Sequence, residues 1–159
     1  PDSILHRSAL DTAQVRAEWR PYRSLEPAVL MRRAREAIEQ EVVLFQRGDV
    51  LQDGQQVVLD RLATHILDLH QATQAVEQEI ELQVRGHHSK EGSRALNKRL
   101  AKARATLVQR QLRKRGVADA VLRPVEAMGT AINPELAGTD DGKVFNRGVT
   151  LRVQLAIEP

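Results

Sequence analysis

Residues 80–116 decide the fold of this chain, and they read IELQVRGHHSKEGSRALNKRLAKARATLVQRQLRKRG. Apolar and polar residues alternate over 80–84, a period of two that predicts a strand ending at Gly86. From about 91 to 115 the apolar residues recur every three or four positions, which predicts the longest helix of the chain. Gly116 then stands where helices commonly end in a left-handed glycine. The stretch therefore predicts a strand that leads through a short loop into a long helix.

Four further segments extend this unit in both directions. They are a buried strand over 42–45, a helix over 56–70, a strand over 122–128 and a strictly alternating strand over 149–155. The order from residue 41 onward is β-α-β-α-β-β. Two strand-helix-strand crossovers and a last strand imply a mixed sheet with helices packed on one face, an α/β fold in the α+β sense.

The first forty residues carry a separate pattern. Alternation over 14–20 predicts a strand, and Pro27 opens a helical stretch, because proline is tolerated at the first helical position. Residues 1–40 are interpreted either as the tail of a preceding domain, which we favour, or as an extra N-terminal strand and helix on a main domain of residues 41–159.

Composition narrows the classes of protein. The chain has 159 residues, of which 42% are hydrophobic and 28% charged, as is usual for a globular domain. It has no cysteine, which excludes disulfides, thiolate metal sites and a cysteine nucleophile. No apolar run approaches the roughly eighteen residues of a membrane helix. Because the chain begins at Pro1 without Met, we expect it to be a piece whose export signal or anchor lies elsewhere.

Charge is distributed unevenly along the chain. Between Arg85 and Arg115 there are eleven Lys or Arg and one acid, so this segment carries +10 and the remainder −7. A basic stretch in an acidic body indicates an anionic partner, and a solvated helix face is the alternative. The segment has no aromatic residue to stack a base, so we expect no nucleic-acid binding.

The loop and helix of residues 86–108 resemble the signature of the OmpA/MotB C-terminal family, which associates with peptidoglycan. In that signature a Gly-His-Thr-Asp loop precedes a helix with the pattern Asn-x-x-Leu-Ser-x-x-Arg-Ala-x-x-Val. The matching positions are Gly86, His87, Asn97, Leu100, Arg104, Ala105 and Val108. Weaker echoes elsewhere are Phe45, Gly48, Leu51, Gly116, Gly129, Pro134, Gly142, Asn146 and Arg147. The resemblance covers about residues 41–157, and the ordered set is more specific than any single element.

The resemblance implies a non-catalytic domain that holds the diaminopimelate of the peptidoglycan peptide stem. It implies that Arg104 grips a ligand carboxylate, for which a planar guanidinium is well matched. The family's loop Asp, which pairs with the ligand ammonium, falls here on Ser89, fifteen residues before Arg104. Losing one partner of a desolvated charge pair costs about 2–5 kcal/mol, roughly thirty- to several-thousand-fold in affinity. A rearranged loop could instead use Glu91.

Each remaining candidate has a functional and a structural interpretation. His87, Asn97 and Arg147 complete the predicted ligand-binding set with Ser89 and Arg104. Alternatively, Arg104 is an ion-pair partner, Asn97 braces the loop, Arg147 is solvated and His87 bonds the backbone.

Two further departures from the family pattern leave the binding interpretation open. Ala101 replaces the usual Ser, and Gly148 stands where a second Arg is usual. The competing hypothesis is therefore a degenerate scaffold that mediates protein–protein contacts in an envelope assembly. In either case the resemblance implies a periplasmic domain attached to a membrane protein of the bacterial cell envelope, of either the inner or the outer membrane.

Catalysis is not expected. The sequence has no Gly-x-Ser-x-Gly elbow, no phosphate loop and no His-Glu-x-x-His motif. The adjacent His87 and His88 lack further ligands at the spacing that metal sites use, so we expect neither a metal nor a cofactor.

Overall fold

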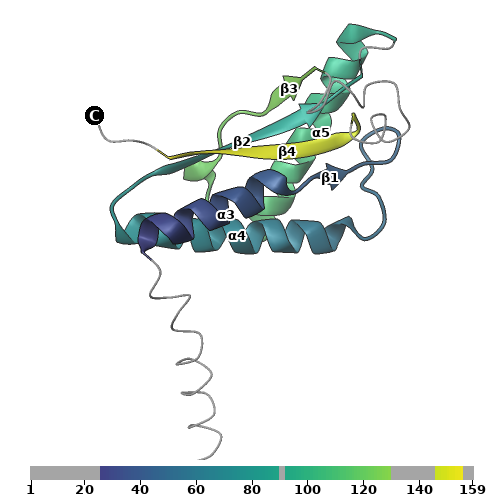
Figure 1. Cartoon of the computed structure of the whole chain (residues 1–159). Coiled ribbons are helices and arrows are strands. Elements are labelled where there is room, and N and C mark those ends of the chain that lie inside the picture. The colour runs from purple at the N-terminus through teal and green to yellow at the C-terminus, as the bar shows by residue number, and fades with distance from the viewer. Residues whose placement is uncertain (1–25, 90–91, 130–145, 156–159) are drawn as a thin grey trace, which may run out of the picture.

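The computed structural model describes residues 26–89, 92–129 and 146–155 as a sheet covered by three helices (Figure 1). The elements are α3 (Pro27–Gln40), β1 (Val43–Leu44), α4 (Gln55–Ala75), β2 (Ile80–His87), α5 (Arg94–Lys114), the 3-10 turn η1 (Asp119–Val121), β3 (Glu126–Met128) and β4 (Gly148–Leu155). From β1 onward this order confirms the predicted β-α-β-α-β-β sequence of elements.

The sheet is mixed, as predicted. Its strand order is β1-β4-β2-β3, with β2 and β3 parallel and β4 antiparallel to both β1 and β2. β4 therefore occupies the position between the two strands that α4 connects. Its pairing with β2 runs from Ile80–Leu155 to Gly86–Val149, which makes this the longest ladder of the sheet. The last strand in the sequence thus holds the two crossover units together.

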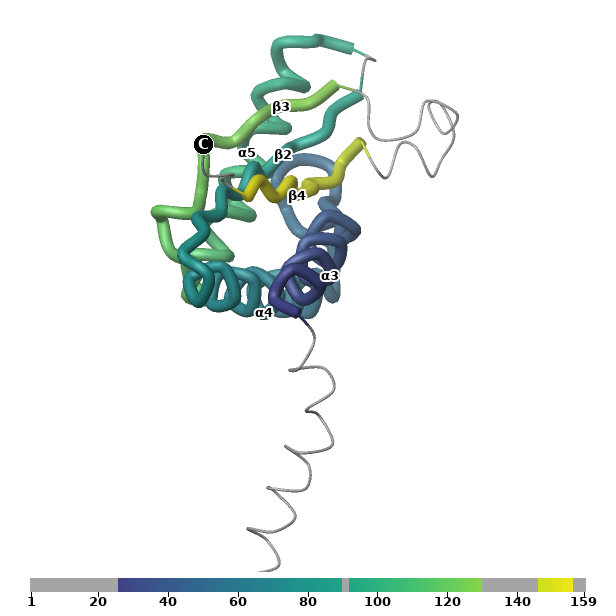
Figure 2. The backbone as a smooth tube through the Cα atoms, turned by 60° about the vertical axis from the view of Figure 1, so that its left-hand side comes forward, coloured from purple at the N-terminus to yellow at the C-terminus, as the bar shows by residue number. Residues whose placement is uncertain are grey.

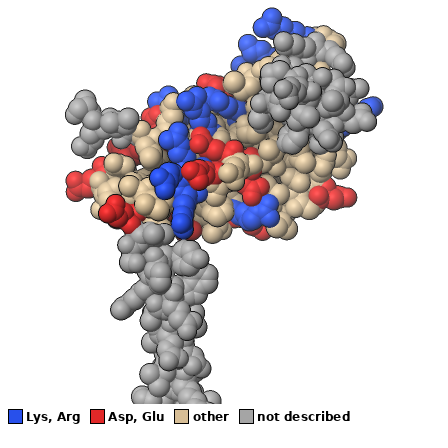
Figure 3. All heavy atoms as spheres, viewed as in Figure 1, with Lys and Arg blue, Asp and Glu red and all other residues tan. Residues whose placement is uncertain are grey.

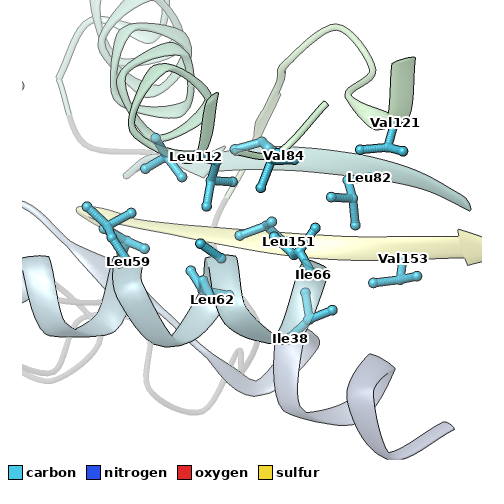
Figure 4. Close-up of a cluster of buried hydrophobic side chains, with 14 of the residues drawn as sticks. Ile38, Leu59, Leu62, Ile66, Leu82, Val84, Leu112, Val121, Leu151 and Val153 are labelled. Carbon is cyan, nitrogen blue, oxygen red and sulfur yellow. The ribbon is translucent and has the colours of Figure 1, made fainter. Parts of the chain in front are cut away.

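All three helices cover the same face of the sheet. The buried core combines side chains of α3, α4 and α5 with the inward-facing residues of β2 and β4, several of which Figure 4 shows pointing toward one another. Among the described residues the core is mostly aliphatic, with Phe45 as its aromatic ring. Its fully buried members include Phe45, Ile38, Leu59, Leu62, Ile66, Leu82, Val84, Leu112 and Val149. The opposite face of these strands is polar, with Arg152 and Gln154 exposed.

Helix α3 belongs to this core. It lies beside α4 and against β4, as the turned view shows (Figure 2). Met31 and Ile38 are buried in the core, and the Glu39 carboxylate accepts a hydrogen bond from the backbone N–H of Val153 at 3.2 Å. The strand predicted over 14–20 lies outside the described residues, and a boundary at residue 40 remains a prediction.

Capping residues at both ends set the boundaries of helix α5. Ser93 Oγ accepts a hydrogen bond from Leu96 N at 3.3 Å, so the helix begins at Arg94 rather than near 91. Gly116 has a φ of 97° and ends it as predicted.

Two predicted segments differ in length from the observed ones. Helix α4 extends to Ala75, because Thr73 is fully buried and keeps the last turn on the core. The predicted strand 122–128 is shorter, because Pro124 has no N–H for a ladder and only Glu126–Met128 pairs continuously with β2.

Gly86 permits the closest approach between the sheet and α5. A Cβ atom added there would collide with the backbone carbonyl of Ala101, which is itself fully buried. Neither partner in this contact is a flexible side chain, so no local adjustment relieves the clash. The absence of a side chain at 86 therefore fixes how near the end of β2 lies to the second turn of α5.

We predict that Gly86→Ala destabilises the domain by about 1–3 kcal/mol or more, because an overpacked contact must displace backbone. Urea unfolding followed by circular dichroism measures this effect. Gly129→Ala is the matched control, since a Cβ at Gly129 meets nothing within 4 Å. Equal stability of the two variants would show that α5 can shift without cost.

Candidate functional site

A cleft of about 310 Å³ lies where β2 ends and α5 begins. It is lined by residues from four parts of the sequence, which are Arg47, His88, Ser89, Asn97, Leu100, Arg104, Asn146 and Arg147. The lining is predominantly polar and cationic. The space-filling view shows Lys and Arg side chains gathered at this end of the molecule, where α5 begins (Figure 3). The cleft is therefore suited to an anionic or carboxylate-bearing ligand.

Arg104 is the most firmly held side chain of the cleft. It projects from α5, is only 4% exposed, and donates from Nε to the carbonyl of Gly48 at 2.7 Å and from Nη2 to the carbonyl of Gln46 at 3.4 Å. Its guanidinium carbon also lies 5.8 Å from the centre of the Phe45 ring. These contacts tie α5 to the loop between β1 and α4 and hold the guanidinium in the wall of the cleft.

The loop after β2 is braced by its neighbours. Asn97 donates from Nδ2 to the carbonyl of Ser89 at 3.0 Å, and Nδ1 of His88 lies 3.1 Å from the same oxygen. Asn97 stands one turn into α5, so this bond couples the loop to the helix. The interpretation of Asn97 as a loop brace is therefore correct in geometry, and its side chain also lines the cleft.

The third wall comes from the segment before β4. Arg147 is half-buried, and its carbonyl accepts a hydrogen bond from Phe45 N at 3.1 Å. Burial, followed by the positive charge of Arg147, lowers the pKa of the Arg104 guanidinium, and the charge of Asp49 partly offsets this. A guanidinium remains charged at physiological pH despite such a shift. Two like charges therefore line the same cleft and repel each other.

His87 lies apart from these residues. It is only 5% exposed, and its Nε2 lies 2.7 Å from the hydroxyl oxygen of Thr150 on the neighbouring strand. It does not appear among the described residues that line the cleft. Burial, then the charges of Arg85 and His88, lower its pKa from the ordinary value of 6.5, and a backbone contact with Gly129 partly offsets this.

The structure thus brings together four of the five residues that the sequence predicts for the site. Ser89, Asn97, Arg104 and Arg147 share one cleft, and His87 is buried without being part of its lining. Arg47 was not predicted as a site residue. It lies in the loop after β1, far from α5 in the sequence, and no local pattern indicates that the two are close in space. Asn146 was noted only as an echo of the family pattern.

No ion pair involving Arg104 occurs among the described residues. Within residues 26–89, 92–129 and 146–155, no group of three or more His, Asp or Glu side chains could hold a metal ion. None of the helices in that part of the chain is long and apolar enough to cross a membrane.

This cleft lies where the end of β2, the loop after it and the basic helix α5 meet. A model of the OmpA family matches residues 50–147, more than half of the chain, and the chain belongs to that family. No curated protein sequence gives a match.

Solved structures share the fold at low sequence identity. The peptidoglycan-associated lipoprotein from Burkholderia pseudomallei is 23% identical, with a TM-score of 0.56 over 74% of this chain and 93% of that one. The periplasmic domain of Helicobacter pylori MotB (residues 78–256) is 21% identical, with a TM-score of 0.55 over 72% of this chain and 71% of that one. These likenesses confirm the mixed α/β fold.

We predict that protonation of His87 destabilises the domain at acidic pH. Because its pKa is lowered in the folded state, the unfolded chain binds the proton more readily, so stability present above pH 6.5 is lost as the pH falls below that value. One such group contributes up to about 1.4 kcal/mol per pH unit. Urea unfolding between pH 7.5 and 5 measures the slope.

His87→Gln should remove that contribution to the slope. Thr150→Ser keeps the hydroxyl beside the ring and should retain it. An unchanged slope in His87→Gln would assign the acid sensitivity to another group.

Proposed function

We propose that this domain tethers its parent protein to peptidoglycan without catalysis, by holding the diaminopimelate of the peptide stem in the cleft. Membership of the OmpA family supports this, as does the shared fold with a lipoprotein described as peptidoglycan-associated. The proposal places the domain in the periplasm. It also implies that the parent protein is attached to a membrane of the cell envelope, either the inner or the outer one.

The observation that carries the proposal is the fixed guanidinium of Arg104. Two of its nitrogens are held by the carbonyls of Gly48 and Gln46, and no described residue bonds its Nη1. Because the Arg104 side chain is already immobilised, it loses little further conformational entropy when a ligand carboxylate binds to it. The charge also makes each hydrogen bond to a carboxylate stronger than a neutral one.

The opposite end of the ligand is less well served. Ser89 lines the cleft at the position that resembles the family's loop Asp, and a hydroxyl accepts a hydrogen bond from an ammonium without neutralising it. Relative to a domain with Asp at this position, the loss of one charge partner lowers the affinity for the zwitterionic side chain by roughly thirty- to several-thousand-fold. We therefore propose a weak tether rather than a tight one.

A degenerate scaffold for protein–protein contacts is the second candidate. The specific observation in its favour is that Arg104 already binds two loop carbonyls, a role that preserves the fold even without a ligand. Pull-down with purified sacculi separates the two functions, because retention supports the tether and free passage supports the scaffold.

We predict that Arg104→Ala abolishes sacculus retention. The variant also loses the two hydrogen bonds to the loop and the packing of the guanidinium on Phe45. We therefore expect its free energy of unfolding to fall by about 1–3 kcal/mol. Sedimentation with sacculi, at a temperature well below the measured melting point, reports binding by the folded fraction.

Arg110→Ala is the matched control, because it removes an exposed cation from the same helix outside the cleft. Retention by Arg104→Ala equal to that of Arg110→Ala would exclude Arg104 as the carboxylate clamp.

We predict further that Ser89→Asp strengthens binding to a diaminopimelate-containing stem peptide by at least about tenfold, because a carboxylate then faces the ligand ammonium. Isothermal titration measures the gain. Ser89→Asn, which has a similar shape without the charge, should show none. If the Asp variant gains nothing, the ammonium of the ligand does not approach residue 89.

A further inference from the structure

The distribution of charge in the cleft specifies more than the presence of a carboxylate. Three guanidinium groups line it, from Arg47 before α4, Arg104 on α5 and Arg147 before β4. The other described lining residues are His88, Ser89, Asn97, Leu100 and Asn146, so no described lining residue carries an acid. Three segments that are far apart in the sequence thus concentrate positive charge in about 310 Å³.

The contacts of these groups leave that charge in place. The backbone carbonyls of Gly48 and Gln46 are neutral, and they accept hydrogen bonds from two nitrogens of Arg104 without cancelling its charge. None of the three guanidiniums forms an ion pair within the described residues. The charge of Asp49 raises the pKa of Arg104, but Asp49 does not line the cleft. The mutual repulsion of Arg104 and Arg147 is consistent with the same field.

Such a cleft distinguishes ligands by their net charge. A ligand with two carboxylates relieves the repulsion among the guanidiniums, and bidentate pairing gives it a defined orientation. A ligand that also brings an ammonium adds one more cation to the cluster. One extra like charge at about 10 Å, at an effective dielectric constant near 20, corresponds to roughly tenfold in affinity.

We propose that the cleft prefers a stem peptide whose diaminopimelate amine is acylated over one whose amine is free. This inference rests on the proposed function and names its ligand class. Acylation converts the ammonium into a neutral amide and leaves both carboxylates, so the ligand keeps what the arginines bind and loses what they repel. In peptidoglycan this describes a stem joined to its neighbour through that nitrogen. The domain is thereby assigned to cross-linked rather than unlinked stems.

The test compares two peptides that differ only in whether one nitrogen is acetylated. One is a stem peptide ending in diaminopimelate with its distal amine free, and the other is the same peptide acetylated at that amine. Isothermal titration of the whole chain at about 20 mM salt should give a Kd about tenfold lower for the acetylated peptide. The ratio should shrink at about 500 mM salt, because screening weakens the repulsion.

Variants identify the groups that create the preference. Arg47→Gln and Arg147→Gln should each bring the ratio of the two Kd values closer to one. Ser89→Asp should invert the ratio, because it supplies a partner for the ammonium. Arg110→Gln removes an exposed cation outside the cleft and should leave the ratio unchanged.

The outcomes separate this inference from the proposed function. Sacculus retention together with equal or tighter binding of the free amine overturns the charge preference and leaves the tether. Preference for the acetylated peptide without sacculus retention supports the charge argument and overturns the tether. Binding of neither peptide, with no retention, overturns both.

Discussion

The close approach of Gly86 to Ala101 is the constraint on which the rest of the structure depends. Because β2 and α5 meet backbone to backbone, the loop that joins them is short and its ends are fixed. Ser89 is thereby held near the first turns of α5, where Asn97 binds its carbonyl. A larger residue at 86 or a helix displaced outward would separate the loop from Arg104, which lies about two turns beyond Asn97. The packing of two elements thus positions both sides of the cleft.

Arg104 connects this junction to the other half of the domain. Its bonds to the carbonyls of Gly48 and Gln46 bring in the loop after β1, and Phe45 links that loop to Arg147 through a backbone hydrogen bond. Arg104 and Phe45 together therefore connect three segments that are separated by many residues. A residue with this structural role remains necessary even where the ligand changes. Its presence alone is consequently weaker evidence of binding than its presence beside Ser89, Asn97 and Arg147.

Sequence patterns predicted most of the fold because the strands and helices here have clean periods. The alternation of 80–84 and 149–155 and the helical spacing from about 91 to 115 each correspond to an observed element. The position of β4 between β1 and β2 has no local signature, since pairing depends on which strand edges remain available. Pro124 shortened β3 by removing a donor from the ladder.

The candidate site was predictable to the extent that its residues lie close in sequence. Ser89, Asn97 and Arg104 are brought together by one loop and one helix, whose geometry follows from their spacing. Arg47 shares the cleft because Arg104 binds the Gly48 carbonyl next to it, a long-range contact that no periodicity indicates. His87 is not part of this cleft lining. It is the last residue of β2, and its ring lies beside the Thr150 hydroxyl on the adjacent strand β4, a long-range pairing that the sequence does not indicate.

The loss of a loop carboxylate and the concentration of arginines have a common physical meaning. An acid at residue 89 would partly cancel the field of Arg47, Arg104 and Arg147, and the cleft would then suit a neutral zwitterion. With serine there, the field of the arginines is not opposed by any described lining residue, so the same geometry favours an anion. The substitution thus need not be read as decay of a binding site. On electrostatic grounds we propose that it changes whether the cleft tolerates a positively charged ligand nitrogen, while Gly86, Asn97 and Arg104 preserve the wall that we propose for a ligand carboxylate.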